Sequence, residues 1–201
     1  VGLMSLKFKT YSPDLSIFIT DHEQTEYFRV VKTAAGKVNP TWAEKTVHRT
    51  HGRMSFKGQK MSSRLGGVPL AQTLVDTLAE EVTEKSDRFD RERDAKLIDA
   101  VAIAALKFTI LRATAGKNIN FDPETSLSFE GDSGPYLQYS TVRAASLLEK
   151  AREMGLSPDS TVPENWQLTD VERLIARFPE IVSRAISEWE PHHVVGYLVE
   201  L

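Results

Sequence analysis

The protein has 201 residues, of which 41% are hydrophobic and 26% are charged. This composition is typical of a soluble globular protein and excludes a largely disordered chain. The sequence contains no cysteine, which excludes disulfide bonds and thiolate metal sites, and its five histidines lack the spacing of a zinc site. Because no apolar run approaches the roughly 20 residues that cross a bilayer, we expect a cytoplasmic protein with no membrane partner.

The net charge of −3 conceals an uneven distribution along the chain. Residues 1–66 hold 11 lysines and arginines against 5 acidic residues, whereas the remainder holds 14 against 23. A basic first third suits a polyanionic ligand such as a nucleotide or a nucleic acid. The chain opens on Val1 and closes on an apolar helical pattern without a cap, so we expect a fragment of a longer protein.

The first third of the chain predicts a parallel β-α-β unit. Residues 15–19 form a short β-rich apolar run, and residues 23–35 carry apolar side chains at helical spacing with Gly36 as a C-cap. A turn at residues 40–42 precedes a second strand candidate at residues 46–51. Two strands joined by a helix lie parallel, and ligands of such sheets gather at the carboxyl ends of the strands.

Helical patterns dominate after residue 67. Apolar residues recur every four positions from Leu70 to Val82, which predicts one apolar stripe on a helix. The densely charged residues 87–94 are predicted to form a solvated face. Residues 95–115 are predicted to form a helix with a wide apolar arc that should be buried.

The last part of the chain predicts four more helical segments. Residues 119–128 form a short, extended excursion before a long helix over residues 136–153. Thr169 and Glu172 fit a capping box, and Pro179 predicts a break in the helix that they begin. The segments after residue 169 are 169–177, 179–189 and 191–201.

Residues 56–67 form the stretch with the clearest chemical character. They contain three glycines, three cations and two adjacent hydroxyls. This composition is typical of a loop whose flexible backbone binds phosphate oxygens, but it also occurs in ordinary surface turns. The order Lys60-Met61-Ser62-Ser63-Arg64 resembles the KMSKS signature loop of class I aminoacyl-tRNA synthetases. In that family, lysines and backbone amides of the loop hold the triphosphate of ATP.

A second passage narrows the resemblance to one family. Residues 127–139 read Leu-Ser-Phe-Glu-Gly-Asp-Ser-Gly-Pro-Tyr-Leu-Gln-Tyr, and Arg143 lies one helical turn beyond Tyr139. This passage, within residues 106–148, resembles arginyl-tRNA synthetases where the catalytic core passes into the helical anticodon-binding domain. The Glu190-Pro191-His192-His193 passage and the Asp21-His22-Glu23-Gln24 corner resemble the same family.

The resemblance implies a fold class of α/β plus all-α. Residues 1–66 would be the C-terminal half of a Rossmann-like nucleotide-binding domain, residues 67–128 a mainly helical connector, and residues 129–201 the first part of a helical anticodon-binding domain. The implied reaction is ATP-dependent attachment of L-arginine to tRNA(Arg) through an arginyl-adenylate, with ATP and Mg²⁺. The resemblance also implies a monomer at full length, and no metal ligands are assigned.

Site residues follow from the same resemblance. Lys60 and Arg64 would be the catalytic cations of the loop, next to three further ATP-binding positions, Met61, Ser62 and Ser63. Gln24 would line the substrate pocket, and His48 and Gly52 would lie near the adenine. Tyr136, Tyr139 and Arg143 fall on one helical face, which is either a tRNA-binding surface with rings for stacking or a packed interface.

Three features separate this chain from a complete synthetase. Ser63 stands where the full signature has a lysine, and the His-Ile-Gly-His signature and the acidic pocket for the guanidinium have no counterpart. We therefore expect the fragment alone to be inactive. The alternatives are a non-catalytic RNA-binding module derived from a synthetase and another class I aminoacyl-tRNA synthetase. His48 and His51 lie three apart on a predicted strand, so they should point to opposite faces and not form a metal pair.

Overall fold

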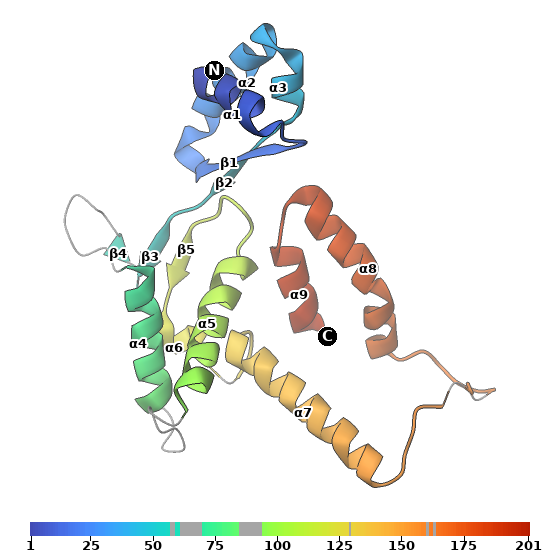
Figure 1. The fold of residues 1–201 in the computed structure, drawn as a ribbon. Helices are drawn as coiled ribbons and strands as arrows, with labels where there is room; N and C mark the ends of the chain where they lie inside the picture. Colours follow the sequence, from blue (N-terminus) through green and yellow to red (C-terminus); the bar gives the residue numbers. More distant parts are fainter. Residues whose placement is uncertain (57–58, 61–69, 85–93, 129, 160, 163) are drawn as a thin grey trace. The chain divides into compact units, whose positions relative to one another are not determined.

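The chain folds into two compact units in the computed structural model (Figure 1). The structure describes residues 1–56, 59–60, 70–84, 94–128, 130–159, 161–162 and 164–201. Unit 1 contains residues 1–55 and 115–119, and unit 2 contains residues 56–114 and 120–201. Both strands of the predicted β-α-β unit therefore lie in unit 1.

Unit 1 is built around two parallel strands, β1 (Ser16–Asp21) and β2 (Thr46–His51). Their register pairs Ser16 with Thr46 at one end and Asp21 with His51 at the carboxyl end. The connection between them runs through a 3-10 turn η1 (His22–Gln24), then α2 (Thr25–Val38) and α3 (Pro40–Glu44). This arrangement confirms the predicted parallel β-α-β unit.

Two helical features of unit 1 differ from the prediction. The predicted C-cap at Gly36 is wrong, because α2 continues to Val38 and its C-cap is Asn39. A Cβ added at position 36 would lie 3.1 Å from the Cβ of Ala43 in α3. Gly36 thus serves the close packing of α2 on α3 and not a cap. The helix α1 (Gly2–Tyr11) was not predicted, since Met4 is its one buried residue and its sequence lacks an apolar face.

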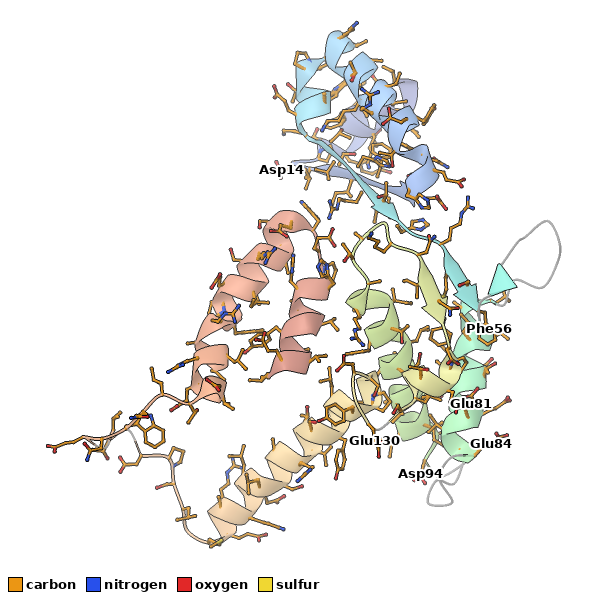
Figure 2. The ribbon with its side chains drawn as sticks, turned by 180° about the vertical axis from the view of Figure 1, so that it is seen from behind. Asp14, Phe56, Glu81, Glu84, Asp94 and Glu130 are labelled. Atoms are coloured by element: carbon orange, nitrogen blue, oxygen red, sulfur yellow. The ribbon has the colours of Figure 1, made fainter. Side chains whose placement is uncertain are left out.

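A second sheet has the strand order β4-β3-β5. Its strands are β3 (Met54–Phe56), β4 (Gln59–Lys60) and β5 (Ile119–Phe121), followed by the short helix α6 (Pro123–Ser126). Phe56, labelled at the end of β3 in Figure 2, stacks on the fully buried Phe121 with ring centroids 6.2 Å apart. The predicted extended excursion at residues 119–128 is thus a strand followed by one helical turn.

The core of unit 2 lies between α4 (Ala71–Glu84) and α5 (Ala95–Arg112), which run side by side (Figure 1). Leu74, Leu78 and Val82 of the predicted stripe are buried, whereas Leu70 precedes the helix and is 73% exposed. The predicted burial of α5 is confirmed along one face, where five residues are buried: Ile98, Val101, Ala102, Ala105 and Phe108. The charged run 87–93 lies outside the described residues.

Unit 2 continues with α7 (Gly134–Glu153), α8 (Asp170–Glu188) and α9 (His192–Glu200). The N-cap of α7 is Ser133, whose hydroxyl accepts a hydrogen bond from the Tyr136 amide at 3.1 Å. The predicted capping box of Thr169 and Glu172 is present at the start of α8. In this unit α7 and α9 both pack against α5, and α8 packs against α9.

The predicted break at Pro179 is wrong. The helix α8 runs through this proline without interruption to Glu188, and its C-cap Trp189 adopts the left-handed conformation. A proline inside a helix removes one backbone hydrogen bond, at a cost of about 3 kcal/mol. Packing of α8 on α9 opposes that loss, and the neighbouring Phe178 contacts Tyr197 of α9 with tilted rings whose centroids lie 5.4 Å apart.

The structure as described is mostly helical, with two small sheets, one of them a parallel pair. Among the described residues, no helix combines the length and the apolar character that a membrane span needs.

Candidate functional site

The carboxyl ends of β1 and β2 form the candidate site of unit 1. Asp21 ends β1 and lies opposite His51, which ends β2. The η1 turn with Gln24 follows β1, and Gly52 and Arg53 follow β2. Predicted substrate-contact residues from two parts of the sequence thus meet at one edge of a parallel sheet, where ligands of α/β folds bind.

His48 is held as a neutral side chain beneath this edge. Its Nε2 atom lies 2.8 Å from the Thr20 hydroxyl, and its ring stacks on Phe28 with centroids 4.5 Å apart. The Phe28 ring in turn contacts the ring of Phe18 in β1, with ring centroids 5.5 Å apart. Partial burial lowers the pKa of His48, so the imidazole is uncharged at neutral pH and offers a flat polar surface.

Gly52 is required by a close approach of two backbone segments. A side chain at this position would place its Cβ 1.9 Å from the carbonyl oxygen of Lys117, which is far inside van der Waals contact. The neighbouring Gly116 has a φ of +83°, a conformation that glycine adopts without strain. The segment 116–118 therefore closes over the end of β2, and Gly52 is the residue that permits it.

Arg53 connects both strand ends to that segment. Its Nε donates to Asp21 Oδ2 at 3.1 Å, and its Nη2 forms an ion pair with Glu23. Its backbone amide donates to Asn118 Oδ1 at 2.9 Å, and its carbonyl oxygen accepts a hydrogen bond from the Ile119 amide at 2.8 Å.

The pKa of Asp21 is lowered by this environment. The main cause is the hydrogen bond that its carboxylate accepts from the Glu23 amide at 2.9 Å, and the Arg53 guanidinium adds to it. The two carboxylates in turn raise the pKa of Arg53. Asp21 and Arg53 are therefore both charged at neutral pH.

The structure brings three of the eight predicted catalytic and ATP- or substrate-binding residues to this edge. They are Gln24, which is exposed at the N-cap position of α2, together with His48 and Gly52. Lys60 is the second of the two residues of β4. Met61, Ser62, Ser63 and Arg64 lie outside the described residues, so their roles stay predictions.

His51 takes no part with His48 in a common site. Its Nδ1 atom lies 2.9 Å from the carbonyl oxygen of Gly52 on the exposed end of the strand. In the described part of the chain, no three or more histidine, aspartate or glutamate side chains are placed to hold a metal ion.

Asp21, Arg53 and Asn118 were not among the predicted site residues. Arg53 lies 32 positions from Asp21 and 65 from Asn118 in the sequence, and nothing in the local pattern indicates that these residues meet. Two signals were available: Asp21 belongs to the corner quoted for the resemblance, and Arg53 follows the predicted glycine.

A second candidate surface lies on α7. Tyr136 is 40% exposed and Tyr139 is 50% exposed, and the Arg143 guanidinium carbon lies 5.6 Å from the Tyr139 ring centroid. The side chain of Gln138 donates to the Ala100 carbonyl oxygen of α5 at 3.4 Å. The helix is thus anchored on α5 near its start and presents Tyr139 and Arg143 to solvent.

Comparison with known proteins places this geometry in context. Residues 137–201 match the DALR anticodon binding domain family. The arginine–tRNA ligase of Bacteroides fragilis is 30% identical to the chain over 211 aligned residues, and that of Ligilactobacillus salivarius is 32% identical over 203. These alignments cover 100% and 97% of the chain, respectively.

The chain is homologous to arginyl-tRNA synthetases. The solved arginyl-tRNA synthetase of Thermus thermophilus matches 94% of this chain with a TM-score of 0.73 at 30% identity, and the match covers 32% of that structure. The Plasmodium falciparum arginyl-tRNA synthetase shares the fold, with a TM-score of 0.66 over 96% of this chain and 34% of its own, at 18% identity. The resemblance deduced from residues 106–148 is thereby confirmed.

The homology to arginyl-tRNA synthetases covers only part of those proteins. The chain spans 35% of the length of the two curated relatives named above. The anticodon-binding match begins at residue 137, inside α7, and includes Tyr139 and Arg143.

Proposed function

We propose that this chain is part of an arginine–tRNA ligase that attaches L-arginine to tRNA(Arg) with ATP. The observation that carries the proposal is the homology to arginine–tRNA ligases over all of this chain, joined to a strand edge that holds Gln24, His48 and Gly52. In this proposal, unit 1 contributes the C-terminal half of a Rossmann-like nucleotide-binding domain. The protein acts in the cytoplasm and is a monomer at full length.

The proposed chemistry begins with activation of arginine. Its carboxylate oxygen attacks the α-phosphorus of ATP, a new P–O bond forms, and the bond to the departing pyrophosphate breaks. The adenylate then passes its arginyl group to a ribose hydroxyl of the tRNA, and AMP leaves. Such chemistry depends mainly on positioning and on neutralising phosphate charge, with little proton transfer by side chains.

The residues of this chain divide that work between binding and charge neutralisation. His48 and the backbone at Gly52 bind the adenine side, and Gln24 contacts the substrate. Lys60 and Arg64 neutralise the triphosphate, and Mg²⁺, when bound, supplies further positive charge to the phosphates. Tyr139 and Arg143 contact the tRNA by stacking and by charge.

Arginine-dependent exchange of pyrophosphate into ATP tests this function. The assay uses the natural full-length protein with tRNA(Arg) present, and we expect exchange with arginine but not with other amino acids. Changing Lys60 to Met should lower kcat about 100-fold through loss of charge on the pyrophosphate. Exchange with a different amino acid would refute the arginine assignment, and salt-dependent tRNA binding without any exchange would identify an RNA-binding module.

A further inference from the structure

Arg53 contacts each of the backbone segments that meet at the candidate edge. Its guanidinium reaches Asp21 at the end of β1 and Glu23 in the η1 turn. Its backbone bonds the segment 116–119 through Asn118 and Ile119. All of these residues belong to unit 1.

Arg53 and its partner Glu23 are each adjacent in sequence to a residue that is predicted to contact the substrates. Glu23 precedes Gln24, and Arg53 itself follows Gly52. The guanidinium therefore links the strand end that carries Gly52 to the turn that carries Gln24. A planar fork can hold two carboxylates at once in fixed directions, which a lysine ammonium does with much less geometric control.

The Asp21 carboxylate makes this link rigid. One of its oxygens accepts the Arg53 Nε–H, and the other accepts the Glu23 amide at the start of the η1 turn. Arg53, Asp21 and the Glu23 backbone thus form a continuous hydrogen-bonded path between the two strand ends. Isolated exposed ion pairs contribute little to stability, but a hydrogen-bonded network can restrict geometry.

We propose that Arg53 is a positioning residue of the substrate site, which holds the His22–Gln24 turn in place relative to Gly52. The inference rests on the proposed function, because it concerns how that site binds arginine and ATP. Arg53 does not touch the reacting atoms in this proposal. It acts through Gln24 on one side and through the Gly52 backbone on the other.

Positioning can be separated from simple charge neutralisation. If Arg53 only neutralised two carboxylates near a bound polyanion, the double variant E23Q/R53M would regain most of the affinity that R53M loses. If Arg53 positions the turn, the double variant stays as weak as R53M, because the link to Asp21 is still missing. The two ideas therefore predict opposite results for one variant.

The test compares R53M, R53K and E23Q/R53M in the natural full-length protein, with R29M as the matched control. Arg29 also pairs with a glutamate, Glu26, at 2.6 Å, but on the exposed surface of α2. In pyrophosphate exchange, R53M should raise the KM for arginine and ATP about tenfold and change kcat less than about threefold. R53K should recover part of the loss, and R29M should behave as the unchanged protein.

Amide hydrogen exchange supplies a readout that does not need catalysis. R53M should speed exchange of the Glu23 amide, which bonds Asp21 Oδ1, while R29M should leave it unchanged. Unchanged KM values in R53M, an unchanged Glu23 exchange rate, or recovered affinity in E23Q/R53M would each overturn the positioning role. Pyrophosphate exchange supported by another amino acid would refute the proposed arginine substrate but leave the test of Arg53 valid. A full-length protein that shows no pyrophosphate exchange would overturn both proposals.

Discussion

Two glycines of this chain are explained by backbone segments that pass close to them. Gly52 faces the Lys117 carbonyl oxygen, and Gly134, at the start of α7, faces the backbone of α5. A Cβ at position 134 would lie 2.4 Å from the Ala104 carbonyl oxygen. Glycine is usually unfavourable within a helix, but here it allows α7 to approach α5 closely.

Changing Gly134 to Ala should therefore destabilise unit 2. The expected loss is about 1–3 kcal/mol, because the backbone of α5 cannot yield as a flexible side chain could. Thermal or denaturant unfolding measures it. The matched control is Gly196→Ala in α9, where a new Cβ meets nothing within 4 Å and should be neutral or stabilising by up to about 1 kcal/mol. Equal stability of the two variants would contradict the close approach.

Tyr139 and Arg143 should contribute differently to tRNA binding. In the full-length protein, R143A should weaken binding and reduce the slope of log affinity against log salt by about 1, since one phosphate contact is lost. Y139A should weaken binding by about 1–3 kcal/mol with little change in slope, because stacking releases no counterions. Filter binding over a salt series measures both, with R29M as control. Identical slopes in R143A and the unchanged protein would argue against a phosphate contact.

Among the elements, α8 shows how tertiary packing overrides a local signal. Pro179 predicts a helix end, yet the helix extends for nine more residues to Glu188. The Phe178–Tyr197 contact and the packing of α8 on α9 hold both sides of the proline in one helix. The helix therefore depends on α9 for its continuity.

Replacing Pro179 with Ala should stabilise α8 locally. Alanine restores the amide that can donate to the Ile175 carbonyl oxygen and removes the steric conflict with the preceding turn. We expect amide exchange along α8 to slow by about fivefold or more, which corresponds to about 1 kcal/mol. Ser183→Ala, an exposed change in the same helix, serves as control. Faster exchange in P179A would show that the proline itself orders the turn.

The capping box of α8 should make the start of that helix sensitive to acid. Glu172 accepts hydrogen bonds from the amide and hydroxyl of Thr169, and these lower its pKa below the ordinary value of 4.5. Because the folded pKa is lowered, the stabilisation is fully present above pH 4.5 and is lost as pH falls through the folded value. Carboxyl NMR titration should show the lowered pKa, and T169A should return it toward the ordinary value. An unshifted Glu172 would contradict the capping geometry.

At the scale of the molecule, the two units correspond to two proposed ligands. Unit 1 contains the strand edge with His48 and Gly52, and unit 2 contains α7, α8 and α9 with the anticodon-binding match. A nucleotide and a tRNA should therefore protect different residues.

Hydrogen exchange of the full-length protein with each ligand tests this division. ATP should slow exchange at the ends of β1 and β2, and tRNA(Arg) should slow exchange along α7. Amide hydrogens exchange more slowly when a ligand binds them or makes local opening of the backbone less frequent. A tRNA that lacks the arginine anticodon is the control for the helical part. Protection of α7 by ATP alone, or of the strand ends by neither ligand, would contradict the assignment.

The amino-acid sequence by itself determined the elements whose signals are local and the family to which they point. A short β-rich apolar run predicted β1, and a turn at residues 40–42 preceded the strand candidate that is β2. Apolar residues at every fourth position predicted α4, a wide apolar arc predicted α5, and Thr169 with Glu172 predicted the start of α8. The order of residues in positions 127–139 indicated arginyl-tRNA synthetases, because a motif of adjacent residues can be recognised from the sequence without knowledge of the fold.

Only the tertiary structure decided the features that depend on distant residues. The continuity of α8 through Pro179 and the close approaches at Gly36, Gly52 and Gly134 involve packing against other elements. Arg53 is the clearest case, since its partners Asp21 and Asn118 come from separate segments. A contact between residues far apart in sequence leaves no periodic or local pattern, so its presence can be read only after the backbone has brought the residues together.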